Sequence, residues 1–299
     1  MHVVLGEDAH STVFAALRLA GFGDQRVTRV AVDEQGRMRA DAFAQIMRKL
    51  DGPILAIAQA GHINTGAFDP FTEIAAIAHE RGAWLHVDGA FGLWARAAKD
   101  RAHLGAGLEL ADSWAVDGHK WLQTPYDCGF AIVRDAAAHR RAMGIAASYL
   151  PPSGENEAYS PSDYVPELSR RARGVGALAM VRHLGREGID AMVSKHCALA
   201  RRFAEKLAAA PGVAIMNDVV LNQVAVRLGA DLAPAQAEAL TRDVIARVQA
   251  GGECFVGGAE WRGAWIIRIS VIGYATTEAD IDRSAAAILE AYRAARAGL

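Results

Sequence analysis

Cysteine is scarce in this chain of 299 residues. The three cysteines, Cys128, Cys197 and Cys254, are widely spaced and form no CxxC pair. A small extracellular domain held together by disulfides needs an even number of closely spaced cysteines. The spacing therefore argues against a disulfide framework, and it favours the reducing cytoplasm as the location of the protein.

Long apolar runs and an excess of either charge are also missing. The longest apolar segments, such as PILAIAQAG at residues 53–61, are far shorter than the roughly 20 residues of a membrane-spanning helix. The first ten residues lack the basic start and apolar core of a signal peptide. The formal net charge is only −2, which indicates neither a nucleic-acid nor a membrane partner. With 52% apolar residues, the chain can build a sizeable core in roughly two domains.

Lysine is rare as well, because only five of the 32 basic residues are lysines. One of them, Lys120, lies in the mostly apolar segment SWAVDGHKWLQTPYDCG at residues 113–129. A flexible, strongly hydrated ammonium group is costly to bury, and elsewhere this chain prefers arginine. A lysine at this position therefore suggests that its amine has a chemical use.

The first half of the chain alternates between two patterns. Apolar or alternating runs predict strands at residues 2–6, 53–61, 83–90, 112–119 and 128–135. Helical spacing that ends in glycine predicts helices between them, for example at residues 69–82. This alternation predicts an α/β fold, with a mostly parallel sheet covered by helices on both faces.

The second half begins differently. The segment SYLPPSGENEAYSPSDYVPELSRR at residues 148–171 is too long for an ordinary connection and predicts a functional loop or lid. A long helical stretch follows from about residue 174, and then shorter strands and helices of a compact α+β domain. We therefore expect a large domain at residues 1–175 and a smaller one at 176–299, which includes the linking helix.

Polar residues follow three of the predicted strands: Asp88, Lys120 and the loop His62–Thr65. Ligands of open parallel sheets bind at the carboxyl ends of the strands. An aldehyde cofactor with a pyridine ring needs a lysine amine for an imine and a carboxylate that keeps the ring nitrogen protonated. A plain salt bridge between Asp88 and Lys120, or a solvated lysine, is the structural alternative. Spacing alone favours that alternative, because paired charges are often only structural.

The sequence around Asp88 and Lys120 is a more specific signal than their spacing. WLHVDGAFG, followed by ADSWAVDGHKWLQTPYDCG, resembles the group II pyridoxal-phosphate-dependent amino-acid decarboxylases, which include aromatic amino-acid, tyrosine, histidine and glutamate decarboxylases. The likeness extends from GEDAHSTVFAALRLAG to RISVIGYATTEADID. It implies a fold-type I enzyme, similar to aspartate aminotransferase, with pyridoxal 5′-phosphate as cofactor. It also implies a homodimer with shared active sites.

The resemblance implies roles for single residues. Lys120 is expected to form the imine with the cofactor, and Asp88 to pair with the pyridine nitrogen. Ala90 is the small residue packed on one face of the ring, and His10 stacks on the other. His119 lies beside the lysine, near the cofactor phosphate.

A tyrosine is the last implied catalytic residue. Tyr149 falls where the family has a mobile-loop tyrosine that gives a proton to the substrate carbon after carbon dioxide leaves. Simpler interpretations exist, because Tyr149, Tyr159 and Tyr164 could be loop anchors and His10 could cap a helix.

Other polar residues invite alternatives. His86, Asp88 and His119 lack the tight spacing of a ligand motif, so no metal is expected. His86 shares a strand face with Asp88 and could hydrogen-bond to it. The arginine-rich segment at residues 170–173 either has a structural role or binds an anion.

The sequence also departs from the family. Family members carry an N-terminal region with a Gly/Ser/Thr-rich loop that cups the cofactor phosphate, and nothing in residues 1–52 resembles it. We therefore expect a truncated chain, a fragment or one part of a split protein. The predicted activity is decarboxylation of an L-amino acid. The alternatives are an aminotransferase or desulfurase-like enzyme of the same fold type, or a non-catalytic remnant that acts as a binding partner.

Overall fold

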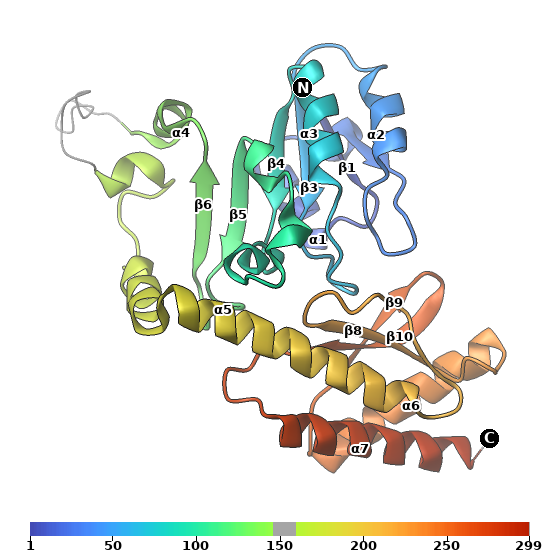
Figure 1. Ribbon diagram of the computed structural model, residues 1–299. Helices are drawn as coiled ribbons and strands as arrows, with labels where there is room; N and C mark the ends of the chain where they lie inside the picture. Colours follow the sequence, from blue (N-terminus) through green and yellow to red (C-terminus); the bar gives the residue numbers. More distant parts are fainter. Residues whose placement is uncertain (146–159, 299) are drawn as a thin grey trace.

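The computed structural model describes residues 1–145 and 160–298, which form two sheets with their helices (Figure 1). The larger sheet contains β1 (His2–Gly6), β2 (Val27–Val30), β3 (Ile54–Gln59), β4 (Trp84–Asp88), β5 (Ser113–Asp117) and β6 (Gly129–Val133). The strand order is β2-β1-β3-β4-β5-β6. All neighbours in it are parallel except β5 and β6, which are antiparallel. The predicted mostly parallel sheet is confirmed.

Helices cover both faces of this sheet, as predicted. They are α1 (Ser11–Leu19), α2 (Ala40–Met47) and α3 (Phe71–Glu80), together with short 3-10 helices that include η2 (Gly92–Ala97), whereas α4 (Ala136–Met143) follows β6 and buries none of its residues. On β1, Val3 and Leu5 pack with Leu17 of α1, whereas Val4 packs in the core that contains α2 and α3. Successive side chains of a strand point to opposite faces, so an apolar run such as β1 is buried on both sides.

The smaller sheet contains β7 (Val213–Ile215), β8 (Gln223–Leu228), β9 (Gly257–Trp261) and β10 (Ala264–Ser270). Its order is β7-β8-β10-β9, and all pairs are antiparallel. Helices α6 (Pro234–Gly251) and α7 (Glu278–Arg296) pack on one face of it, together with the second half of α5 (Arg173–Ala208). This arrangement is the α+β unit expected from the sequence.

Helix α5 runs along the boundary between the two sheets (Figure 1). Its residues Ile189 and Val193 belong to the core of the large sheet, and Phe203 and Leu207 belong to the core of the small one. The sequence predicts one continuous helix here, but Gly185 interrupts it with φ 61° and ψ −176°. Glycine adopts this conformation without steric cost. The domain division at residues 175 and 176 stays a prediction, close to the start of α5.

Parallel pairing brings the ends of β1, β3, β4 and β5 to one edge of the large sheet. The polar segments that follow these strands therefore lie at the same edge, as the sequence predicts. No helix in the described part of the chain is both long and apolar enough to cross a bilayer.

Candidate active site

Asp88 and Ala90 connect the ends of β4 and β5. Asp88 is the last residue of β4, and its Oδ1 accepts a hydrogen bond of 3.1 Å from the backbone N–H of Ala90. The carbonyl of Ala90 in turn accepts a hydrogen bond of 2.8 Å from the N–H of Asp117, the last residue of β5. The N–H of Gly89 binds the carbonyl of Ala115 at 2.9 Å. These bonds fix the Asp88 carboxylate beside the segment that carries Lys120.

Lys120 follows β5 and has a carboxylate partner that the sequence interpretation missed. Its Nζ lies 2.8 Å from Oδ2 of Asp117, and 34% of the lysine side chain is exposed. Within the described residues, no ion pair joins Lys120 to Asp88, so the salt bridge considered from the sequence does not form. The signal for the true partner was the spacing of three residues between Asp117 and Lys120. Asp117 is itself held by Trp94, whose indole N–H donates to its carbonyl at 2.9 Å.

His119 is anchored by its own loop. Its Nδ1 contacts the backbone of Cys128, 2.7 Å from the carbonyl oxygen and 3.1 Å from the amide nitrogen. Its ring lies on that of Tyr126, with centroids 4.3 Å apart. Nε2 is 3.5 Å from Oδ2 of Asp117, so His119 and Lys120 share the carboxylate of Asp117. This geometry keeps the imidazole beside Lys120.

His10 caps helix α1, which is the simpler interpretation weighed from the sequence. Its Nδ1 accepts a hydrogen bond of 3.3 Å from the N–H of Thr12 and lies 2.7 Å from the hydroxyl of the same residue. Such a bond satisfies one of the free N–H groups at a helix start. The stacking role implied by the resemblance stays a prediction. Tyr149 lies outside the described residues.

Two further interpretations are resolved by contacts. His86 does not bond to Asp88; its Nδ1 lies 2.8 Å from the hydroxyl of Ser113, and burial lowers the pKa of its imidazole. In the arginine-rich segment at residues 170–173, Arg173 forms an ion pair with Asp127 at 3.0 Å, and Arg171 donates a hydrogen bond to the carbonyl of Tyr126 at 2.6 Å. These arginines therefore fasten the start of α5 to the loop after Lys120, which supports the structural alternative.

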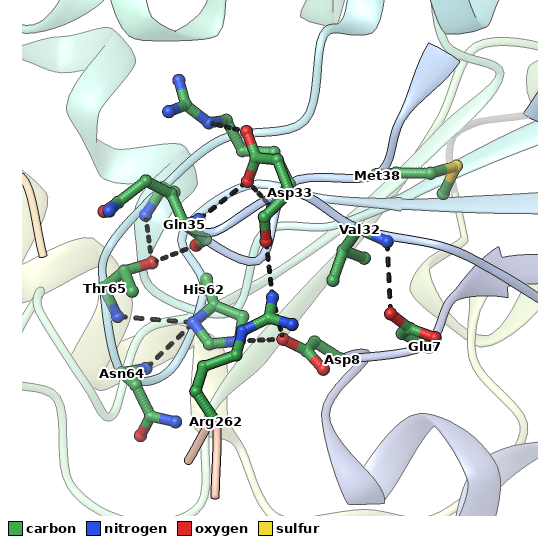
Figure 2. Close-up of polar contacts among 12 residues, drawn as sticks. Glu7, Asp8, Val32, Asp33, Gln35, Met38, His62, Asn64, Thr65 and Arg262 are labelled. Carbon is green, nitrogen blue, oxygen red and sulfur yellow. Dashed lines mark hydrogen bonds and ion pairs between the residues drawn. The ribbon is translucent and has the colours of Figure 1, made fainter. Parts of the chain in front are cut away.

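A polar cluster forms around the predicted loop His62–Thr65 at the same edge, with partners that the sequence interpretation did not name (Figure 2). Buried His62 follows β3, and its Nδ1 accepts hydrogen bonds from the N–H groups of Asn64 and Thr65 at 3.2 and 3.3 Å. Its Nε2 lies 3.7 Å from Oδ2 of Asp8. Burial lowers the pKa of His62 to about 4, although the negative charge of Asp8 acts in the opposite direction.

Arg262 connects this cluster to the small sheet. It lies in the turn between β9 and β10, and its Nη2 is 3.2 Å from Oδ2 of Asp8 and also donates to the carbonyl of Asp33. Trp261 beside it packs near His62, with ring centroids 6.0 Å apart. The tip of the small sheet is thus held against the edge that carries the candidate site.

The donor set of this edge fits a pyridine aldehyde. A primary amine, Lys120, and a carboxylate, Asp88, follow neighbouring strands, and the residue between them, Ala90, presents only a methyl group. An aldehyde is held covalently by an amine, and a pyridine nitrogen keeps its proton beside a carboxylate. The chemistry of the side chains therefore matches the cofactor implied by the sequence.

Comparisons with known proteins agree with this chemistry. A family described as "Pyridoxal-dependent decarboxylase conserved domain" matches residues 1–229. The L-2,4-diaminobutyrate decarboxylase of Rhizobium meliloti is 30% identical over 245 residues, which cover 80% of this chain and 49% of that protein. The aromatic-L-amino-acid decarboxylase of Drosophila lebanonensis is 28% identical over 280 residues, which cover 92% of this chain and 67% of that protein.

Solved structures show the same fold. A crystal structure of Oryza sativa TDC with PLP and tryptamine has a TM-score of 0.91 at 23% identity, covering 98% of this chain and 62% of that one. Mouse CSAD has a TM-score of 0.88 at 22% identity, covering 97% of this chain and 64% of that one. The chain therefore spans about half to two thirds of the length of the proteins that it matches.

Proposed function

The chain belongs to the pyridoxal-dependent decarboxylase family, and from that membership we propose that it decarboxylates an L-amino acid to the corresponding amine and carbon dioxide. The observation that carries the proposal is the pair of strand ends that present Asp88 and Lys120, joined through the backbone of Ala90. Aromatic, acidic, small aliphatic and diamino acids are all candidate substrates.

Lys120, Asp88 and Asp117 have separate roles in the proposed reaction. Pyridoxal phosphate, when bound, supplies an electron sink for the pair released from the Cα–carboxylate bond. Lys120 would hold it through Nζ, and Asp88 would keep a proton on the ring nitrogen. Asp117 lies 2.8 Å from Nζ and orients the amine of Lys120 at the end of β5.

The other implied roles are part of the proposal. Ala90 and His10 would pack on the two ring faces, and His119 would lie near the phosphate. Tyr149 would protonate Cα after the loss of carbon dioxide. The support for all four is the family resemblance, together with the positions of Ala90, His10 and His119 at the carboxyl edge.

Product analysis tests the activity. Purified chain is incubated with pyridoxal phosphate and each amino-acid class, and carbon dioxide and amine are measured by mass spectrometry. We expect both products from at least one class, and neither from Lys120→Ala. A keto acid in place of carbon dioxide would indicate an aminotransferase. No turnover in protein that carries the cofactor on Lys120 would contradict the proposal.

We also propose that the protein is a cytoplasmic homodimer. Support comes from the resemblance, from the cysteine spacing and from an apolar face on α5. Val175, Leu178 and Val181 are 69%, 57% and 42% exposed, and Val181 lines an apolar hollow of about 550 Å³ with Phe130 and Ile132 of β6. Apolar patches of this kind often mark interfaces between proteins. Light scattering should give twice the chain mass, and Leu178→Lys should lower it; a monomeric wild type would contradict the dimer.

A further inference from the structure

The segment that carries Lys120 is tied to the small sheet through buried groups that have no part in the proposed chemistry. We propose that His196 is a positioning residue: through Trp121 it fixes the backbone of Lys120 relative to the segment that follows β10. This inference rests on the proposed role of Lys120. It concerns where the amine is held rather than which bond is broken.

The first connection is a chain of two hydrogen bonds. Trp121, the residue after Lys120, is completely buried, and its indole N–H donates to Nδ1 of His196 at 2.9 Å. His196 lies on α5, is also completely buried, and its Nε2 is 3.0 Å from the carbonyl oxygen of Gly273. Gly273 follows β10 of the small sheet. Three segments far apart in the sequence therefore meet at one imidazole.

The two partners determine the state of His196. An indole nitrogen can only donate a hydrogen bond, so Nδ1 of His196 must be without a proton. A carbonyl can only accept, so Nε2 must carry the proton. A neutral imidazole in this tautomer satisfies both bonds, whereas a charged one would place two N–H groups against each other. Burial has the largest effect on the pKa of His196 and lowers it. The hydrogen bond to the Gly273 carbonyl raises this pKa by a smaller amount.

A second connection joins the same two segments. Gln123, three residues after Lys120, donates from Nε2 to the carbonyl of Ile272 at 2.7 Å and to that of Lys120 at 3.2 Å. The backbone of Gln123 adopts φ 60°, a conformation that non-glycine residues rarely adopt and that is unfavourable in free energy. This conformation directs the Gln123 side chain toward the two carbonyls. Both connections start within the three residues that follow Lys120, and they end on adjacent residues, Ile272 and Gly273.

Two connections to one segment constrain the orientation of the Lys120 backbone as well as its position. A buried Trp–His pair that only stabilised the fold would not fix the orientation of the Lys120 peptide groups. Here the carbonyl of Lys120 is itself a partner of Gln123. Loss of the His196 bond should therefore change the environment and reactivity of the amine even in a folded protein.

The test uses the low number of lysines. Reductive ¹³C-methylation gives one NMR probe on each of the five lysines, and Lys120→Arg assigns the signal of Lys120. Trp121→Phe keeps the ring but removes the hydrogen bond to His196. Trp114→Phe is the matched control, because it removes an indole hydrogen bond of the same length, 2.9 Å, from Trp114 of β5 to the carbonyl of Leu108 in η4 (Leu108–Leu110). His196→Gln probes the other end.

We expect Trp121→Phe and His196→Gln to shift or broaden the Lys120 signal and to leave that of Lys206 unchanged. The rate of pyridoxal phosphate attachment to Lys120 should fall by roughly tenfold or more, because misplacing a reacting group is costly. Trp114→Phe should change neither quantity. An unaltered Lys120 signal and rate in both variants, with unfolding transitions intact, would overturn the inference.

A measurement on the wild type covers the case in which the variants do not fold. Long-range ¹⁵N–¹H spectra report the tautomer of His196, and we expect a bare Nδ1 and a protonated Nε2. The opposite tautomer would refute the connection. If pyridoxal phosphate never attaches to wild-type Lys120, the proposed function fails, while the methyl-lysine spectra still decide whether His196 positions the amine.

Discussion

Asp69 and His62 are buried titratable residues at the edge that carries Lys120. Asp69 accepts hydrogen bonds of 2.7 Å from the backbone N–H groups of Met38 and Gln59, one on each oxygen. Burial raises the pKa of its carboxyl to about 7, although both N–H groups favour the ionised form. The carboxylate thus holds the turn after β2 and the end of β3 together, and it has a structural rather than a chemical part in the site.

Asp69→Asn should destabilise the protein by about 1–3 kcal/mol, because an amide NH₂ would face one of the two backbone N–H groups and leave it unsatisfied. Urea unfolding at pH 8 measures the loss. Asp41→Asn is the control, since Asp41 is exposed and pairs with the exposed Arg39, and the urea midpoint of this variant should hardly move. Equal midpoints for wild type and Asp69→Asn would show that Asp69 does not hold this turn.

His62 predicts a pH dependence of stability. Its pKa is about 4 in the folded protein and about 6.5 when unfolded, so between these values the unfolded chain binds more protons. The free energy of unfolding should therefore rise as the pH increases from 4 to 6.5, by up to about 3 kcal/mol from this residue. Asp69 acts in the opposite direction between pH 4 and 7. The measurement is thus the difference in pH slope between wild type and His62→Gln; identical slopes would refute the prediction.

At the scale of elements, the connection between β4 and η2 places Asp88 and Ala90. Gly92 begins η2 against the end of β3, and a Cβ atom there would lie 2.2 Å from the carbonyl oxygen of Ala60. Because that neighbour is backbone in a sheet, it cannot move aside easily. The absence of a side chain at Gly92 lets the loop after β4 lie close to the end of β3.

Gly92→Ala should accordingly cost about 1–3 kcal/mol or more through overpacking. It should also weaken cofactor attachment, since the displaced loop carries Ala90, whose N–H holds the Asp88 carboxylate. Thermal unfolding and a pyridoxal phosphate titration measure the two effects. Gly174→Ala is the matched control, because nothing lies within 4 Å of a Cβ atom at that position. A variant as stable as this control would contradict the packing argument.

Many elements could be predicted from local pattern, and others could not. The strand β3 and the helix α3 follow from an apolar run and from periodicity with a terminal glycine. The antiparallel direction of β6 depends on which neighbour it meets, and the break at Gly185 depends on a single torsion angle. Neither property is encoded in a hydrophobic pattern.

The candidate site divides in the same way. Asp88 and Lys120 could be proposed because their residue types suit one chemistry and the sequence around them resembles a known family, whereas their spacing alone favoured a salt bridge. The ion pair of Lys120 with Asp117 joins residues that are close in sequence. The sequence alone does not tell that Lys120 pairs with Asp117 rather than with Asp88. His196 lies 75 residues from Trp121 and Arg262 lies 254 residues from Asp8, so no local signal indicates either contact.

At the scale of the whole molecule, two sheets share helix α5 and meet at the edge that carries the candidate site (Figures 1 and 2). Arg262 is the charged contact between the tip of the small sheet and Asp8. The Arg262 side chain is one third exposed, so the ion pair should stabilise the protein by only roughly 0.2–1 kcal/mol. Its larger effect should be on local opening of the tip.

Arg262→Ala should therefore leave global unfolding almost unchanged and raise hydrogen exchange at residues 257–265 and 7–10. Exchange followed by mass spectrometry measures this. Arg247→Ala is the control, because that residue pairs with Asp243 one turn away on the same helix and connects no separate segments. Unchanged exchange at the tip would show that the contacts of Arg262 do not hold it in place.

The account depends most on Lys120. The direct measurement is to mix the chain with pyridoxal phosphate, reduce with borohydride and map the label over all five lysines by peptide mass spectrometry. We predict a pyridoxyl group on Lys120 far above the level on Lys99, whose side chain is 83% exposed, and a marked loss of that label in Asp88→Ala. A label spread over the exposed lysines, with none in excess on Lys120, would contradict the account.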